Sequence, residues 1–333
     1  MKKIFIRSPY FIEIDEVDQT SAKIEIFLWN KGTTEPTIPT YTLSKNIASQ
    51  LQTLIAFNVA NYAKEYIKPI APVSVSVPTE ENVKNWCYMK IVRYSNDVEL
   101  DDETFVCFNG YTQYLDGYNQ STEDEVVPLI NPNINLTTFS GYNYIDVWIE
   151  DNQTYLWEGN NDNFFTTSTE GLWKLPYDYD RYRLSIDGTS EYFFTIQTEQ
   201  LCEVKYTPIT CKFINRFGGW QFLTFFKANS SGIDVTSKDF DILPSSINYN
   251  VLQGQKKVFN SQGKQKIKCN TGWVDENYFE LIQDLLLSET VLLDNKPVTV
   301  KSQSSEYKTN IKDKNINYEI EFEYNFGLIN DVI

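Results

Sequence analysis

Hydrophobic and polar residues alternate with a period of two along much of this chain. Such alternation is typical of half-buried strands, because successive side chains of a strand point to opposite faces of the sheet. It is clearest in residues 11–15, 22–29, 73–77, 142–149, 192–196 and 318–324. The pattern predicts a mainly β fold, and the aromatic content of 15%, carried by Tyr and Phe, agrees with it.

Polar stretches between the strands predict which of them pair. The expected pairs are 11–15 with 22–29 across a turn at 18–21, 86–93 with 104–108, and 291–293 with 298–301. Another hairpin is expected within residues 256–269, where the polar run Asn260-Ser261-Gln262-Gly263 separates two alternating segments.

Helical spacing of apolar residues appears in only two places. Before Pro69, a short helix is expected at about residues 61–67, preceded by extended chain. Residues 276–287 combine Asp275 as a candidate N-cap with acidic residues in the first turn and apolar residues on one face.

Together these elements predict a mainly β protein of two antiparallel β-sandwich-like domains with one or two short helices. The expected N-terminal domain spans residues 1–203 and includes an acidic, aromatic-rich insertion at about 94–173. The expected C-terminal β domain spans 204–333 and carries the helix near 276–287.

The chain contains no histidine, which removes many enzyme classes. It cannot build a Ser-His-Asp or Cys-His nucleophile site, and it cannot supply histidine ligands to a metal. Carboxylate chemistry such as glycoside hydrolysis survives, but nothing selects pairs such as Asp146 with Glu150 or Glu158 with Asp162. We therefore expect no enzymatic activity, no catalytic residue, no cofactor and no metal site.

The cysteines are scattered and odd in number, without a C-x-x-C motif. They are expected to be reduced and buried, as in a chain that folds in a reducing cytoplasm, although a Cys202–Cys211 bridge stays open as an alternative. The five positions are Cys87, Cys107, Cys202, Cys211 and Cys269.

Charge is placed unevenly on this chain of net charge −16. No basic residue lies between Arg93 and Lys174, a stretch with two acidic triplets, Asp101-Asp102-Glu103 and Glu123-Asp124-Glu125. These acids have three interpretations: solvated loops, a calcium site without the EF-hand pattern, or the wall of a lumen that does not bind DNA.

Two further segments are candidate subunit interfaces. The lysines Lys256, Lys257, Lys264, Lys266 and Lys268 either protect the edge of a sheet or contact an acidic neighbouring copy. The loop Arg216-Phe217-Gly218-Gly219-Trp220 either inserts its aromatic residues into a neighbour or is an ordinary turn with core aromatics. The aromatics Tyr155, Trp157 and Trp173 are interpreted as core or interface residues in preference to a sugar platform.

Targeting and membrane segments are not expected. The apolar run Ile4-Phe5-Ile6 after Met1-Lys2-Lys3 is too short for a signal peptide, and no apolar stretch approaches the length of a membrane span. We expect no membrane anchoring.

Three stretches carry a resemblance to a known family. They are IFIRSPY at residues 4–10 with FLWNKG at 27–32, FINRFGGW at 213–220, and TGWV at 271–274. With them the chain resembles tail-associated structural proteins, ring or hub subunits, of crAss-like and related phages of Bacteroidota. The resemblance does not extend over the acidic region.

The resemblance implies a virion protein, assembled in the bacterial host cytoplasm, that forms a six- or twelve-fold ring of the tail barrel or hub. Its partners would be further copies of itself and adjacent tail, portal or hub proteins, with double-stranded DNA passing through the lumen without specific binding. The alternative is a carbohydrate-binding or glycan-degrading virion protein involved in host attachment.

Overall fold

The structure, a computed structural model, is mainly β with mostly antiparallel sheets, as the alternation predicts. It describes residues 1–47, 54–81, 85–131, 136–138, 143–150, 152–159, 162–178, 181–200, 205–242, 252, 254–275, 278–302 and 315–329.

The chain divides into two compact units, and each is discontinuous in sequence. Unit 1 comprises Met1–Cys202, Lys212–Leu223 and Asn277–Glu289, and unit 2 comprises Glu203–Cys211, Thr224–Glu276 and Thr290–Ile333. The helix α1 (Tyr278–Leu287), which the pattern predicts, belongs to unit 1. Its Asp284 accepts a hydrogen bond from Tyr111, and its Glu280 pairs with Arg216, both residues of the same unit.

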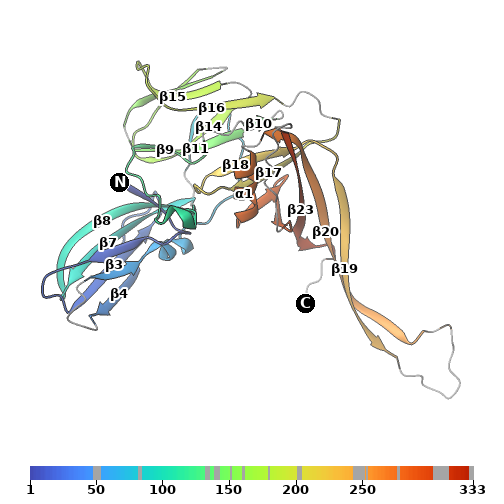
Figure 1. Ribbon diagram of the computed structural model, residues 1–333, viewed down its shortest axis with the longest axis horizontal. Helices are drawn as coiled ribbons and strands as arrows, with labels where there is room; N and C mark the ends of the chain where they lie inside the picture. Colours follow the sequence, from blue (N-terminus) through green and yellow to red (C-terminus); the bar gives the residue numbers. More distant parts are fainter. Residues whose placement is uncertain are drawn as a thin grey trace. The chain divides into compact units, whose positions relative to one another are not determined.

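The first sheet of unit 1 has the strand order β1-β8-β7-β3-β4 (Figure 1). Its core face carries Ile24, Ile26, Leu28, Met89 and Phe105, all at most 2% exposed. The strands are β1 (Lys2–Phe5), β3 (Ser21–Trp29), β4 (Tyr41–Asn46), β7 (Trp86–Ser95) and β8 (Val98–Phe108). The predicted pairing of 86–93 with 104–108 is confirmed by β7 and β8.

The same core face is covered by a two-stranded sheet and a short helix. The sheet consists of β2 (Phe11–Ile14) and β5 (Ile55–Asn58), and Ala63 of the 3-10 helix η1 (Ala60–Glu65) is buried in the same core. The short helix before Pro69 is confirmed as η1. The expected hairpin of 11–15 with 22–29 is wrong, because β2 pairs with β5 while β3 pairs with β4 and β7.

The strand expected at residues 73–77 is also absent, although all of these residues are described. Val73 and Val77 are 71% and 54% exposed, so this alternating segment has no sheet to bury either face.

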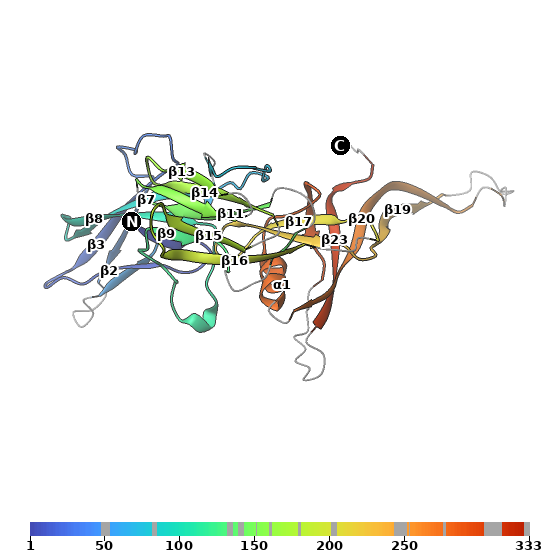
Figure 2. The ribbon, with the colours of Figure 1, turned by 90° about the horizontal axis from the view of Figure 1, so that it is seen from above.

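The rest of unit 1 contains two sheets that share one core. One has the order β6-β14-β11-β9 and the other β10-β16-β15-β12-β13. Figure 2 shows β11 and β14 of the first sheet and β15 and β16 of the second. Val147, Tyr155, Trp157, Leu175 and Tyr182 are buried in this core. The strands are β6 (Thr79–Glu81), β9 (Val126–Pro128), β10 (Leu136–Thr138), β11 (Asn143–Ile149), β12 (Thr154–Glu158), β13 (Asn163–Thr166), β14 (Gly171–Tyr177), β15 (Arg181–Ile186) and β16 (Tyr192–Gln200).

A seven-stranded sheet, β18-β17-β21-β22-β23-β20-β19, contains all the strands of unit 2. Its strands β17 and β18 contribute residues to both units. The strands are β17 (Ile209–Ile214), β18 (Trp220–Phe225), β19 (Ser230–Asp241), β20 (Lys256–Asp275), β21 (Val291–Leu293), β22 (Lys296–Val300) and β23 (Asn315–Gly327). The predicted pairing of β21 with β22 is confirmed.

The hairpin expected within residues 256–269 is wrong. Residues 256–275 form the single strand β20, and the chain turns back between Asp241 of β19 and Lys256. The polar run is a bulge and not a turn, because Asn260 has φ +53° and the register with β19 shifts beside it, between Thr236 and Lys238. Asparagine tolerates this left-handed conformation better than most residues.

Candidate functional site

The loop from Arg216 to Trp220 is the tight turn between β17 and β18, packed inside unit 1. The side chain of Asn215 organises it, since its Oδ1 accepts hydrogen bonds from the backbone N–H groups of Phe217 and Gly219 at 3.0 and 3.1 Å. Gly218 has φ +86°, which favours glycine. Trp220 is 2% exposed, so the interpretation as a turn with core aromatics fits this geometry better than insertion into a neighbour.

A buried carboxylate holds the end of this turn. Asp146 on β11 is 1% exposed, and its Oδ2 accepts a 2.7 Å hydrogen bond from the backbone N–H of Trp220. Burial raises the pKa of Asp146 to about 7; the Trp220 hydrogen bond and Lys174 lower it, and Glu81 raises it. Lys174 lies opposite Asp146 on β14 and forms a 2.6 Å ion pair with the buried Glu81.

The carboxyl group of Asp146 is held inside the fold by the protein's own backbone. A carboxyl with a raised pKa is typical of general acids, but here its hydrogen bond goes to the backbone of the same chain.

Tyr155, Trp157 and Trp173 are at most 9% exposed, so the core interpretation of these aromatics is confirmed and they form no sugar platform. Among the described residues, no three cysteine or carboxylate side chains gather as a metal site.

Strand β1 lies between the two segments that carry the acidic triplets. β1 pairs with β8, which carries Asp101, Asp102 and Glu103, and its Lys3 bridges to Thr122 beside the second triplet. Glu123, Asp124 and Glu125 are exposed, as are Asp101 and Asp102, while Glu103 is partly buried. These acids lie at the surface and make this side of unit 1 negatively charged.

Some of these acids are already paired within the chain. Arg93 contacts Asp101 at 2.6 Å and Glu103 at 3.4 Å, and Lys90 lies 3.6 Å from Asp102. Two cations therefore face five acids between residues 97 and 103, so the segment keeps an excess of negative charge.

Three of the candidate lysines form a ladder of ion pairs on β20. Lys264 contacts Glu323 at 3.2 Å, Lys266 contacts Asp234 and Glu321, and Lys268 contacts Glu319 at 2.8 Å. β20 lies between β19 and β23 here, so these lysines do not protect a sheet edge. Their partners are glutamates of β23 and an aspartate of β19 within the same unit.

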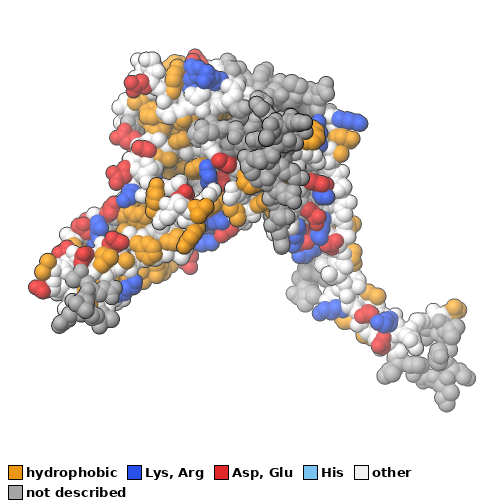
Figure 3. Space-filling model, viewed as in Figure 1, with side chains coloured by type: hydrophobic (Ala, Val, Ile, Leu, Met, Phe, Trp, Pro, Cys, Tyr) orange, Lys and Arg blue, Asp and Glu red, His pale blue; other side chains and the backbone are white. Residues whose placement is uncertain are grey.

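Beyond the ladder, β19 and β20 continue as a two-stranded ribbon that we call the arm, residues 235–241 and 256–263 (Figure 1). Pairing of β20 with β23 begins only at Lys264. None of the twelve residues of β19 is buried, and its apolar side chains Ile233, Val235 and Phe240 are 61%, 66% and 48% exposed. Figure 3 shows hydrophobic and lysine side chains next to one another along this ribbon.

The arm presents one face that combines aromatic rings with lysines. Lys238 pairs across the strands with Phe259, and Phe240 with Lys257, so all four side chains lie on the same face. The two rings are 5.5 Å apart in an edge-to-face arrangement. Lys256 points to the other face and contacts Asp239 at 3.2 Å.

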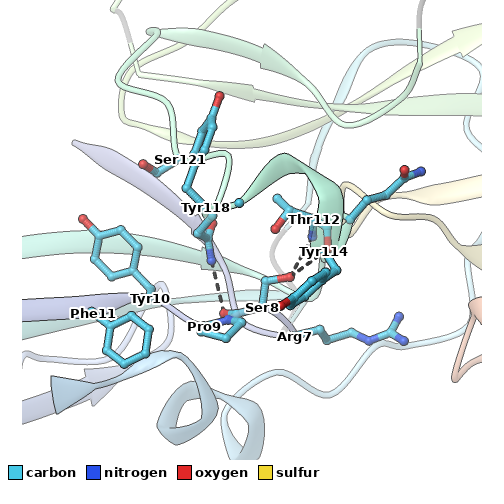
Figure 4. Close-up of a pocket in the computed structure, with 12 residues that line it drawn as sticks. Arg7, Ser8, Pro9, Tyr10, Phe11, Thr112, Tyr114, Tyr118 and Ser121 are labelled. Carbon is cyan, nitrogen blue, oxygen red and sulfur yellow. Dashed lines mark hydrogen bonds between the residues drawn. The ribbon is translucent and has the colours of Figure 1, made fainter. Parts of the chain in front are cut away.

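Unit 1 also has an open pocket of about 840 Å³, which the sequence pattern does not reveal. Two segments about 100 residues apart form it, residues 7–11 and 112–121, and Figure 4 shows Tyr10, Phe11, Tyr114 and Tyr118 on them. Ser8 holds the two segments together, because its hydroxyl accepts a hydrogen bond from the backbone N–H of Thr112 at 2.7 Å. In the sequence these two segments stand out only by their aromatic residues, which have no regular spacing and so do not indicate a pocket.

The loop beside the pocket exposes apolar residues at its tip. Tyr114 and Leu115 are 98% and 92% exposed on the short helix η2 (Tyr114–Asp116). A capping box between Gln113 and Asp116 and a left-handed Gly117 hold this turn in place. Tyr114 and Leu115 are therefore exposed on a turn that its own hydrogen bonds hold in place.

Comparisons of the chain with protein-family models, with curated proteins and with solved structures found no match. No helix in the described part of the chain has both the length and the apolar character needed to cross a bilayer.

Proposed function

We propose that this chain is a structural protein of a phage virion, a subunit of a self-associating ring of the tail barrel or hub that builds the DNA conduit between portal and distal tail. The observation that carries the self-association is the arm. A two-stranded ribbon is marginally stable alone in water, and exposed apolar strands invite pairing with another chain. Val235 and Phe240 in the β19 strand of the arm are such residues, and a neighbouring subunit would cover them.

Ring formation follows if the arm of each copy contacts a different surface of the next. Contacts of this head-to-tail type close into rings when the rotation between copies closes. The exposed acidic triplet Glu123-Asp124-Glu125 of unit 1 supports the conduit. DNA that passes a negatively charged wall releases no counterions to it and therefore does not bind there. The absence of histidine supports a non-enzymatic role.

The test is the mass of the purified protein, measured by sedimentation with negative-stain imaging at physiological salt. We expect the wild type to form closed rings of about six or twelve copies. In the matched variant, residues 235–263 are replaced by an Asn-Gly turn, which joins Asp234 to Lys264 and leaves the pairing of β20 with β23 intact. This variant should stay monomeric. A wild type that is monomeric at every concentration would contradict the proposal.

The pocket favours a second candidate function, carbohydrate binding in host attachment. Tyr10, Phe11, Tyr114 and Tyr118 offer ring faces that stack on sugars, and Gln113 and Ser121 offer polar groups. The double substitution Tyr114→Ala with Tyr118→Ala should abolish glycan binding by the monomer while leaving the thermal transition unchanged. Absence of glycan binding by the wild type would remove this candidate.

A further inference from the structure

The aromatic and lysine face of the arm is defined by four residues, Lys238, Phe240, Lys257 and Phe259, which we call the arm patch. Its two rings are 48% and 45% exposed. Neither Lys238 nor Lys257 forms an ion pair with any other described residue, in contrast to the lysines of the ladder. The arm patch therefore offers apolar surface and two uncompensated positive charges to whatever covers it.

A second surface has the opposite properties. Residues 98–104 of β8 pair with β7 on one side only, because β1 pairs with β8 only from Phe105 to Phe108. Among the described strands, none lies along the other side of this segment, which we call the acidic edge. Val98 and Leu100 on it are 65% and 41% exposed, and Glu99, Asp101 and Asp102 are exposed beside them.

The two surfaces match in length as well as in character. The acidic edge has seven residues and so does the β19 strand of the arm, which at about 3.3 Å per residue makes each about 23 Å long. Each presents exposed apolar side chains between charged ones, positive on the arm patch and negative on the acidic edge. Complementary charge of this kind fixes the register of an interface and disfavours wrong partners.

We infer that the arm patch of one copy docks on the acidic edge of a second copy of this chain. The inference rests on the proposed self-association and names the two surfaces that meet in it. One chain carries both surfaces, so a single contact, repeated from copy to copy, is enough to build a ring. The docked arm covers Phe240 and Phe259 with Val98 and Leu100, and it neutralises Lys238 and Lys257 with the acids of β8.

Charge reversal tests this contact. One variant carries Lys238→Glu with Lys257→Glu, and the other carries Glu99→Lys with Asp102→Lys. Each should weaken self-association about ten-fold or more in sedimentation, because like charges then meet across the interface. The control Lys68→Glu with Lys205→Glu makes the same change of charge at exposed lysines elsewhere and should assemble as the wild type does.

Mixing the two variants is the decisive step. A one-to-one mixture should recover assembly, since the reversed arm of one variant is then complementary to the reversed edge of the other, and the two unaltered surfaces also match. A chain with all four substitutions should assemble alone. Recovery on mixing cannot arise from a contact inside one chain.

The outcomes separate this inference from the proposed function. If the wild type assembles and both reversal variants assemble equally well, this docking is wrong while the ring proposal stands. A wild type that never assembles overturns both. Binding of the wild type to anionic lipid vesicles that is lost in the Lys238→Glu, Lys257→Glu variant would assign the arm patch to a membrane surface and overturn the docking.

Discussion

The Oδ2 atom of Asp146 accepts a hydrogen bond of 2.7 Å from the backbone N–H of Trp220, 74 residues further along the chain. This bond ties the central strand β11 to the first residue of β18. The other carboxylate oxygen, Oδ1, is buried without a hydrogen-bond partner within the described structure. A carboxylate in this position costs free energy when it is ionised, because burial removes its hydration and the neighbouring Glu81 repels it.

The position of Asp146 predicts how stability depends on pH. Its pKa of about 7 lies above the value of the unfolded chain, so the folded state holds the proton more tightly. The free energy of unfolding should therefore fall as pH rises from about 4 to about 7 and then level off. The free energy of unfolding of Asp146→Asn should not fall in this way, because the amide does not ionise. Between pH 4 and pH 8 it should therefore rise by up to about 4 kcal/mol relative to that of the wild type.

Urea unfolding at several pH values measures this difference. Asp187→Asn, in the exposed turn between β15 and β16, provides the matched control, because it makes the same substitution at a surface carboxyl. A constant difference for Asp146→Asn would show that the carboxyl does not titrate in this range.

Gly218 and Gly188 have the same backbone conformation but different surroundings. Comparing them separates the cost of a left-handed backbone from the cost of a steric clash with an added Cβ. Gly218 and Gly188 have φ +86° and +79°. A Cβ at Gly218 would lie 2.9 Å from the backbone nitrogen of Asn109, whereas a Cβ at Gly188 would meet no atom within 4 Å. Gly188→Ala should cost about 1 kcal/mol for its left-handed backbone. Gly218→Ala should cost about 1–3 kcal/mol more, because the turn cannot move away from β8.

Chemical denaturation of the two variants gives this comparison directly. Equal losses of stability would mean that the turn between β17 and β18 moves freely and makes room for a Cβ at position 218.

The buried Lys3 depends on Glu150. Its Nζ lies 2.9 Å from Glu150 Oε1 and donates a hydrogen bond to the carbonyl of Asp124, and the residue is only 2% exposed. Glu150→Gln should cost about 3 kcal/mol at pH 7, because it leaves a buried ammonium without its counter-charge. The double variant with Lys3→Met should be less destabilised than the two single losses added together.

The pH dependence of this pair has the opposite sign to that of Asp146. Hydrogen bonds from Lys3 and the N-terminal amine lower the pKa of Glu150 despite its partial burial. Its contribution to stability is therefore present at neutral pH and is lost as pH falls through the folded pKa, below the usual value of 4.5. Additive losses in the double-mutant cycle at pH 7 would show that the pair is not coupled.

The sequence pattern identifies strands well where one face is buried. Residues 22–29 alternate and form β3, whose side chains alternate between buried and partly buried. The same pattern is wrong at Val73 and Val77, because alternation describes two faces but does not supply a neighbouring strand. Partners distant in sequence, such as β1 with β8, depend on the packing of the whole unit and leave no local signal.

The candidate surfaces follow the same division. Acidic and basic residues were predictable as surface groups, since charged side chains are rarely buried. The ion pairs that these residues form were not predictable. Lys266 has two acidic partners, whereas Lys257 has no ion pair among the described residues. The difference arises because β23 lies beside only one end of β20, and that register cannot be read from the lysine spacing.

Four thiols should be unreactive in the folded protein. Cys87, Cys107, Cys211 and Cys269 are free and buried, and burial raises the pKa of Cys269 to about 12 and that of Cys107 and Cys211 well above the usual value. Since the thiolate is the reactive form, a Cys202→Ser variant should not react with a disulfide reagent at pH 8 within minutes, while guanidinium should release all four thiols. Cys202 is replaced because it lies outside the described residues. Rapid native labelling would show that one of these cores opens, and the labelled cysteine would identify which one.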